Sequence, residues 1–367
     1  MAARRAGTGR AVSPLDAARR AVQPADMPMP EDIPDRPQFW ADVAAAVRAE
    51  CAEEAGHGQP DFHRTMAAIK ASLPAARGVE AGRIHFMIDT GQACDIDSHD
   101  HFFRIRRSAT NAAAAFLSSQ IQTLHILATE LKSAPTSLAP ERLQGLAGAL
   151  RGTIAFAVGS NAVGPTALTV RTYALGQNEA DCSGGRWVRG HQIFAGLCQS
   201  LVFVFKALKR AEVDGDGETA RQTGELVCVL LTASATALEL TGDFPAARYN
   251  ASIRVSMDAP YFPTGFSGVL SRDHRELVSR MKMMRPAIES LQRRDPDLHA
   301  RIGASLSAVY ASHKHVCARF VAPEATSLLM AATAERPATE QIDRFRKMRL
   351  RAWETEKGDV QSANAAE

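Results

Sequence analysis

Cysteine is scarce in this sequence and shows no motif spacing. The six cysteines lie at positions 51, 94, 182, 198, 228 and 317 of 367 residues, and no two of them form a Cys-x-x-Cys pair. This distribution excludes a zinc ribbon and a dense disulfide framework. We therefore expect mostly free thiols, which are typical of cytoplasmic proteins.

Long apolar runs are also missing. No run reaches the roughly 18 residues of a membrane helix without a charged or polar break, so we expect no membrane partner. Arg4 and Arg5 are not followed by the apolar stretch of an export signal. The sequence therefore predicts a cytoplasmic protein.

The chain also has little excess of either charge. The formal net charge is only +3, which is too small to predict binding to nucleic acid. The turn at residues 159–165, GSNAVGP, has no Lys-Ser/Thr of a phosphate loop, and neither Gly-x-Gly-x-x-Gly nor Gly-x-Ser-x-Gly occurs. These absences exclude the common nucleotide-binding and serine-hydrolase motifs.

Proline divides the chain into three regions. Residues 1–36 combine Ala, Arg and frequent Pro, which predicts a disordered or extended N-terminal arm. Residues 37–356 have the composition of a single helical domain, and residues 357–367 form a polar, disordered tail. Hydrophobic residues make up 46% of the chain, which is ample for a large core.

Helical periodicity dominates the central region and predicts an all-α fold with about ten helices and at most two short strands. The segment Arg83–Asp89 is a strand candidate. Residues 243–271 are irregular, and loops of this length are commonly functional. We expect helices at Phe39–Glu54, Phe62–Leu73, His101–Lys132, Pro140–Val158, Trp187–Arg210, Glu218–Leu240, His274–Met284, Asp297–Val321, Pro323–Ala334 and Glu340–Trp353.

The helix expected at Asp297–Val321 carries His313 and Cys317 four residues apart. At 3.6 residues per turn both side chains leave one face, within an apolar stripe that includes Ile302, Leu306 and Phe320. An imidazole and a thiol on such a face suit a flat, apolar ligand such as haem. From the spacing alone, a buried histidine beside a packed cysteine is the more frequent explanation. A Cys-x-x-Cys-His haem-attachment motif is absent.

Two nearby histidines are excluded as partners of His313 in one site. His315 lies about 200° around the helix from His313, and His299 lies about 21 Å back along it. An opposite ligand must come from another element, with His274, His191 and His125 as candidates.

Two polar clusters offer alternatives. One contains Asp95, Asp97, His99, Asp100 and His101, whose residue types suit a non-haem metal site, although such residues also cap helices. The other contains Arg104, Arg106 and Arg107, which suit a carboxylate clamp but are more often solvated at the surface.

The pattern His313-x-x-x-Cys317, with His274 upstream, resembles the haem-dependent aromatic amino-acid oxygenases, whose fold is similar to tryptophan 2,3-dioxygenase. The resemblance implies that His313 and His274 are the two axial ligands of haem iron. It also implies that Cys317 forms a single thioether bond to the macrocycle. The implied reaction is hydroxylation of 3-methyl-L-tyrosine to 3-hydroxy-5-methyl-L-tyrosine with hydrogen peroxide, in tetrahydroisoquinoline antibiotic biosynthesis.

Typical members of that family keep one axial position open, whereas two histidines would close it. We therefore expect His274, which follows the irregular segment, to leave the iron and then act as general acid and base. The resemblance also implies a homodimer. Two other functions stay open: a haem-binding sensor or electron-transfer protein, and a non-haem metal enzyme that uses Asp97, His99 and His101.

Overall fold

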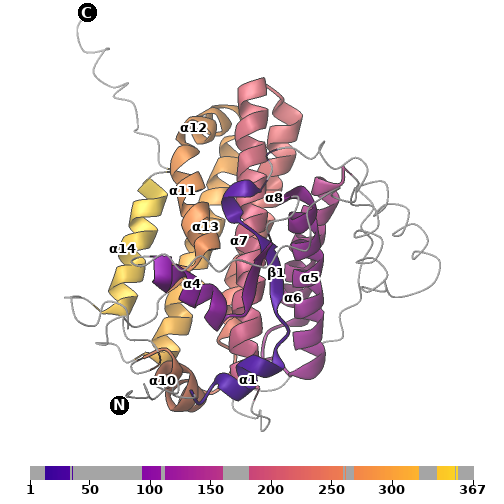
Figure 1. The fold of residues 1–367 in the computed structure, drawn as a ribbon. Coiled ribbons are helices and arrows are strands. Elements are labelled where there is room, and N and C mark those ends of the chain that lie inside the picture. The colour runs from indigo at the N-terminus through magenta and orange to yellow at the C-terminus, as the bar shows by residue number, and fades with distance from the viewer. Residues whose placement is uncertain are drawn as a thin grey trace, which may run out of the picture.

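The computed structural model describes residues 13–33, 35, 93–108, 112–159, 182–258, 261, 268–321, 337–351 and 353. Within these residues the protein is a bundle of helices with one small parallel sheet of two strands, β1 (Ala25–Pro28) and β2 (Ile105–Ser108) (Figure 1). The predicted all-α class is therefore confirmed.

Two long helices, α7 (Ser183–Asp214) and α8 (Gly217–Thr241), form the centre of the bundle. Gly215 ends α7 with a φ of 71°, a left-handed conformation that glycine adopts without steric cost. Asp216 then caps α8 by accepting a hydrogen bond from the Thr219 backbone N–H. Both helices are long and apolar enough to cross a membrane, but most of their apolar surface is buried in this core.

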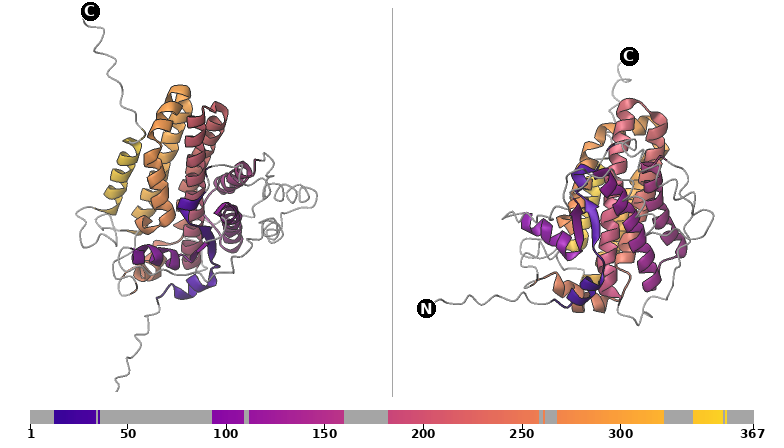
Figure 2. Two further views of the ribbon diagram at one scale, coloured as in Figure 1. Left: turned by 45° about the horizontal axis from the view of Figure 1, so that its top comes forward. Right: turned by 45° about the vertical axis from the view of Figure 1, so that its right-hand side comes forward.

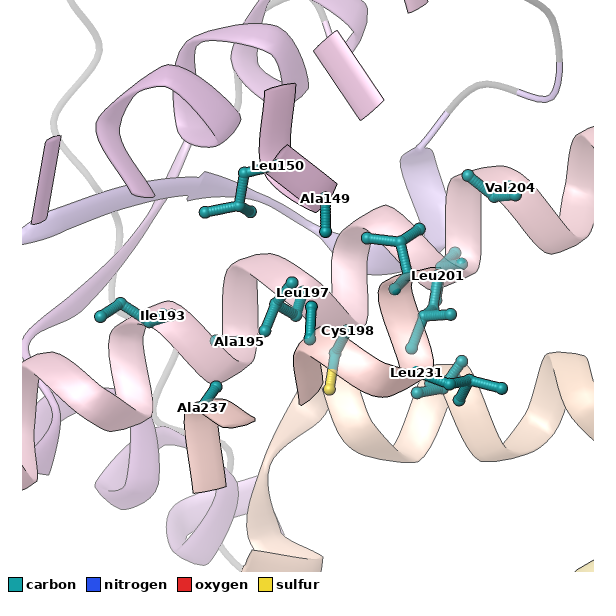
Figure 3. Close-up of a cluster of buried hydrophobic side chains, with 14 of the residues drawn as sticks. Ala149, Leu150, Ile193, Ala195, Leu197, Cys198, Leu201, Val204, Leu231 and Ala237 are labelled. Carbon is teal, nitrogen blue, oxygen red and sulfur yellow. The ribbon is translucent and has the colours of Figure 1, made fainter. Parts of the chain in front are cut away.

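The remaining helices cover the two sides of this central pair. Helices α5 (Ala112–Ser133) and α6 (Pro140–Ala157) pack on one side, and α13 (Pro296–Phe320) packs along α8 on the other (Figures 1 and 2). Figure 3 shows the core where Leu150 of α6 and Leu231 of α8 flank Leu197 and Leu201 of α7. Helix α13 packs on α8, one of the helices of this core.

Shorter elements complete the side of the bundle near α13. The segment after α8 contains α9 (Ala246–Arg248), η3 (Tyr249–Ile253), α10 (Arg254–Ser256) and η4 (Gly268–Leu270), so the irregular region 243–271 is partly short helical turns. It leads into α11 (Arg272–Met283) and α12 (Arg285–Arg294). Helix α14 (Ala338–Arg351) follows α13 and packs on it.

The single helix predicted at His101–Lys132 is wrong. The chain instead forms α4 (Ala93–Phe102), turns at Arg104 with a φ of 55°, passes through strand β2 and restarts as α5. The reason is tertiary, because β2 pairs with β1 from a distant part of the chain. Within β2, Arg106 faces the exposed Asp26 while Arg107 points inward, the alternation expected of a strand.

Part of the segment expected to form the N-terminal arm packs on the bundle. Helix α1 (Asp16–Ala21), β1 and η1 (Pro30–Asp32) belong to the folded domain, and Leu15, Met27 and Ile33 are buried in its core. Within the predicted arm, Ala25–Pro28 is extended, but as a paired strand. The elements expected at Phe39–Glu54, Phe62–Leu73, Arg83–Asp89 and Pro323–Ala334, and the tail 357–367, lie outside the described residues.

Candidate functional site

One edge of α13 carries three side chains in order along the helix: Tyr310, His313 and Cys317. At about 100° per residue, they fall within about 60° of one another around the axis. The most deeply buried stripe of α13 lies beside them and is formed by Leu298, Ile302, Leu306, Ser312, Val316 and Phe320. The predicted pairing of His313 and Cys317 on one face is therefore confirmed, at the border of the packed stripe.

A close contact between α13 and the end of α8 holds this edge in place. A Cβ atom on Gly242 would lie 2.7 Å from Cγ1 of Val316 and 3.2 Å from the Phe320 ring. Only glycine allows α13 to approach this closely. The same end of α13 is tied by Arg319, which donates hydrogen bonds to the carbonyls of Gly242 and Phe244.

We infer that His313 lines a recess between the helices. Its side chain has substantial solvent-accessible surface, yet burial among the surrounding groups lowers its pKa. The exposed surface and the lowered pKa are consistent with each other if the ring faces an internal space rather than the outer surface. The imidazole is therefore neutral near pH 7, the form that binds a metal.

His274, near the start of α11, approaches the same space. Burial, together with the neighbouring His313, Arg349 and His99, lowers its pKa to about 4. His274 and His313 thus lie within electrostatic range of each other, although they come from different helices. The ring of His274 also lies 6.4 Å from that of Phe194 on α7.

An ion-pair network fixes the beginning of α11 beside His274. The Arg107 guanidinium donates to both carboxylate oxygens of the buried Asp273, at 3.0 and 2.8 Å, and to both of Asp100, at 2.8 and 2.9 Å. Burial acts against the charge of Arg107, but Asp273 and Asp100 outweigh it and raise its pKa. Gln199 of α7 donates a further hydrogen bond of 2.9 Å to Asp273. The predicted default of solvated arginines is therefore wrong for Arg107.

His191 of α7 forms a second wall of the recess. Burial, with smaller contributions from His99 and His313, lowers its pKa to about 3. Its Nδ1 lies 2.7 Å from the Trp187 carbonyl oxygen, which can only accept, so Nδ1 carries the proton and Nε2 is a free acceptor. The ring stacks on Phe103 at a centroid distance of 3.9 Å and packs against Trp187 at 4.5 Å.

Aromatic residues surround Cys317. Tyr249 stacks on Phe320 with ring centroids 4.5 Å apart, and Trp187 lies 5.5 Å from Tyr249. Burial raises the pKa of the Cys317 thiol to about 11, so this sulfur is a neutral thiol in an apolar wall. Its surroundings suit contact with an apolar, aromatic ligand.

The polar cluster at residues 95–101 does not form a metal site in the part of the chain that the structure describes. No three His, Cys, Asp or Glu side chains converge there in a way that would hold a metal ion. Asp97 pairs with Arg272, Asp100 pairs with Arg107, and His101 is exposed. His99 instead turns inward, where it is 3% exposed and packs against Phe103 at 4.9 Å.

The structure thus gathers His99, His191, His274 and His313 from four helices around one space. Of the candidate partners of His313, it brings His274 and His191 near. His299, which helix geometry excluded, contacts the Trp353 carbonyl with its Nε2 at 3.1 Å. Two neutral imidazoles and a thiol one turn from one of them fit the donor set of an iron macrocycle. No sequence pattern pointed to Trp187, Tyr249 or Arg349 as neighbours of the site, because their contacts come from distant segments.

Comparison with known proteins places this geometry in context. The fold is similar to a crystal structure of reduced SfmD, obtained by soaking with sodium hydrosulfite, with a TM-score of 0.61 and 23% sequence identity. The similarity covers 80% of this chain and 97% of the other. A similar protein from Streptomyces lavendulae, 3-methyl-L-tyrosine peroxygenase, is 34% identical over 167 residues, which span 46% of each chain.

A family profile described as SfmD 3-methyl-L-tyrosine peroxygenase matches residues 26–301. The match covers most of the chain and includes most of β1, the Arg107 network, His191 and His274, and it ends before His313 and Cys317. The chain belongs to the SfmD 3-methyl-L-tyrosine peroxygenase family.

Proposed function

We propose that this protein is a haem-dependent peroxygenase that converts 3-methyl-L-tyrosine to 3-hydroxy-5-methyl-L-tyrosine, for the biosynthesis of tetrahydroisoquinoline antibiotics such as saframycin. The overall reaction balances with one molecule of hydrogen peroxide consumed and one molecule of water released. The observation that carries the proposal is the pair of neutral imidazoles, His274 and His313, within electrostatic range of each other, with the Cys317 thiol one helical turn from His313.

In this proposal His313 and His274 would hold the haem iron, and Cys317 would hold the macrocycle through a thioether. The haem supplies the centre at which peroxide is activated and an oxygen atom is delivered to the aromatic ring. His313 is the fixed ligand, because α13 is wedged against Gly242 and tied by Arg319. Cys317 keeps the cofactor from dissociating when the opposite ligand moves.

His274 would be the ligand that leaves. Because the Arg107 ion pairs hold the backbone at neighbouring Asp273, it would move by rotation of its side chain. Once free, the neutral imidazole can accept the proton that peroxide loses and return it later. The unprotonated Nε2 of His191 would suit a hydrogen bond from a phenol bound beside it.

The first experiment is an absorption spectrum of the purified protein followed by turnover. We expect a Soret band, and hydroxylation of 3-methyl-L-tyrosine with hydrogen peroxide but not with dioxygen and a reductant. Absence of a Soret band would refute the proposal, and a Soret band without turnover would indicate a haem sensor or electron-transfer protein.

Two variants test the assigned residues. His274→Ala should lose one axial ligand in the visible spectrum and lose turnover, whereas His315→Ala, an exposed position on the same helix as His313, should change neither. Cys317→Ala should release its haem into acidified organic solvent while the parent protein retains it. Equal extraction from both proteins would exclude the thioether. Homodimer formation and a cytoplasmic location stay predictions.

A further inference from the structure

Arg349 is a half-buried cation whose Nε atom is buried, on the Tyr310 side of His313 and away from Cys317. It follows the buried Ile342 by two helical turns, so it lies on the inward face of α14. The helix lies along α13 (Figure 2), where Lys314 pairs with Asp343 at 2.5 Å. Arg349 therefore enters the site from an element that the function described so far does not use.

The guanidinium of Arg349 is only partly satisfied. It donates a hydrogen bond to the Tyr310 phenol oxygen and lies within electrostatic range of His274. Its Nε is buried and has no hydrogen-bond partner among the residues that the structure describes, and no Asp or Glu among those residues pairs with it. A buried, unpaired guanidinium donor is costly, and a carboxylate is the group whose two oxygens match its planar geometry.

The order of residues along α13 predicts where this carboxylate lies relative to His313 and Cys317. Tyr310 precedes His313 by one turn and Cys317 follows it by one turn, so the two lie about 10 Å apart along the helix. A haem carries its vinyl groups and its propionates on opposite edges. If a vinyl carbon is bound to Cys317, the propionate edge points along α13 toward Tyr310 and Arg349.

We propose that Arg349, oriented by Tyr310, is the receptor for a haem propionate, and that Cys317 and Arg349 together fix the rotation of the macrocycle about the axis through its iron. This inference rests on the proposed haem function. The substrate amino acid also carries a carboxylate, so the experiment has one arm for each source of that group.

The cofactor arm uses the Cys317→Ala protein, in which haem is held without a covalent bond and its transfer to excess apomyoglobin can be timed. Adding Arg349→Gln should accelerate haem loss by about ten- to a hundred-fold, the effect of removing a charge-assisted hydrogen bond. With haem dimethyl ester, whose propionates are neutral, the same substitution should have no effect. Arg346→Gln, an exposed arginine on the same helix, is the matched control and should be neutral for both cofactors.

The substrate arm uses the covalently loaded protein and compares 3-methyl-L-tyrosine with 3-methyltyramine, which lacks the carboxylate. If Arg349 binds a propionate, Arg349→Gln changes the dissociation constants of the two compounds equally. Selective weakening of 3-methyl-L-tyrosine binding, or equal acceleration of the loss of haem and its dimethyl ester, overturns the proposal.

Two milder variants serve as controls for misfolding of Arg349→Gln. Arg349→Lys keeps the charge and should accelerate haem loss less than Arg349→Gln does, and Tyr310→Phe should show a smaller effect with the same preference for haem over its ester. Unchanged haem loss in both, with unchanged melting temperatures, would also overturn the assignment. A parent protein without any Soret band would instead refute the proposed function itself.

Discussion

The neighbouring arginines of β2 provide a matched pair for testing how the site is held. Arg107 is buried between Asp100 and Asp273, with side-chain exposures of 14%, 8% and 0%. Arg106 makes an ion pair with Asp26 in which both side chains are about half exposed, at 50% and 51%. The two substitutions Arg107→Leu and Arg106→Leu therefore remove the same type of residue from one strand in two different environments.

Arg107→Leu should cost about 3–5 kcal/mol of unfolding free energy, because it leaves buried carboxylates without their counter-charge. Asp273 would keep only the hydrogen bond from Gln199, and Asp100 would keep Arg272, whose Nε lies 3.4 Å away. Arg106→Leu should cost about 0–1 kcal/mol, since water screens an exposed pair. A typical protein has an unfolding free energy of about 5–15 kcal/mol, so the loss from Arg107→Leu is a large part of it.

Chemical denaturation of both variants, followed by circular dichroism, measures this difference. Adding Asp273→Asn to Arg107→Leu should recover part of the loss, because the unpaired charge is then removed while Gln199 keeps an acceptor. If haem binds as proposed, Arg107→Leu should also shift the visible spectrum away from two axial ligands, since Asp273 precedes His274 directly. Equal costs for Arg106→Leu and Arg107→Leu would refute this reasoning.

Two further predictions concern the walls of the recess. The folded pKa of His191, about 3, lies below its unfolded value of 6.5, so the unfolded state binds more protons and stability falls as pH drops from about 6.5 toward 3. Between pH 7 and pH 5 the unfolding free energy should fall by about 2 kcal/mol. Urea titrations at both pH values should show a smaller fall for His191→Phe, and an unchanged fall would contradict the assignment. Gly242→Ala should cost about 1–3 kcal/mol by melting, because its Cβ would meet Val316 at 2.7 Å, and an unchanged melting temperature would show that α13 can shift freely.

The sequence alone determined the helices and the face that carries the candidate ligands. Local periodicity predicted the helices at Pro140–Val158, Trp187–Arg210, Glu218–Leu240 and Asp297–Val321, because the apolar repeat of a long helix is contained within its own residues. The same repeat put His313 and Cys317 on one face of α13. It also excluded His299, which the structure shows turned toward Trp353.

Only the tertiary structure decided what lies opposite that face. The strand β2 forms inside a helical pattern because β1 pairs with it, and this pairing turns Arg107 inward to meet Asp273 from a segment 166 residues later. His274, His191 and Arg349 approach the recess from α11, α7 and α14 for the same reason. A local pattern fixes which residues share a helix face, whereas the neighbours across a cavity depend on how distant helices pack, and no repeat in the sequence records that packing.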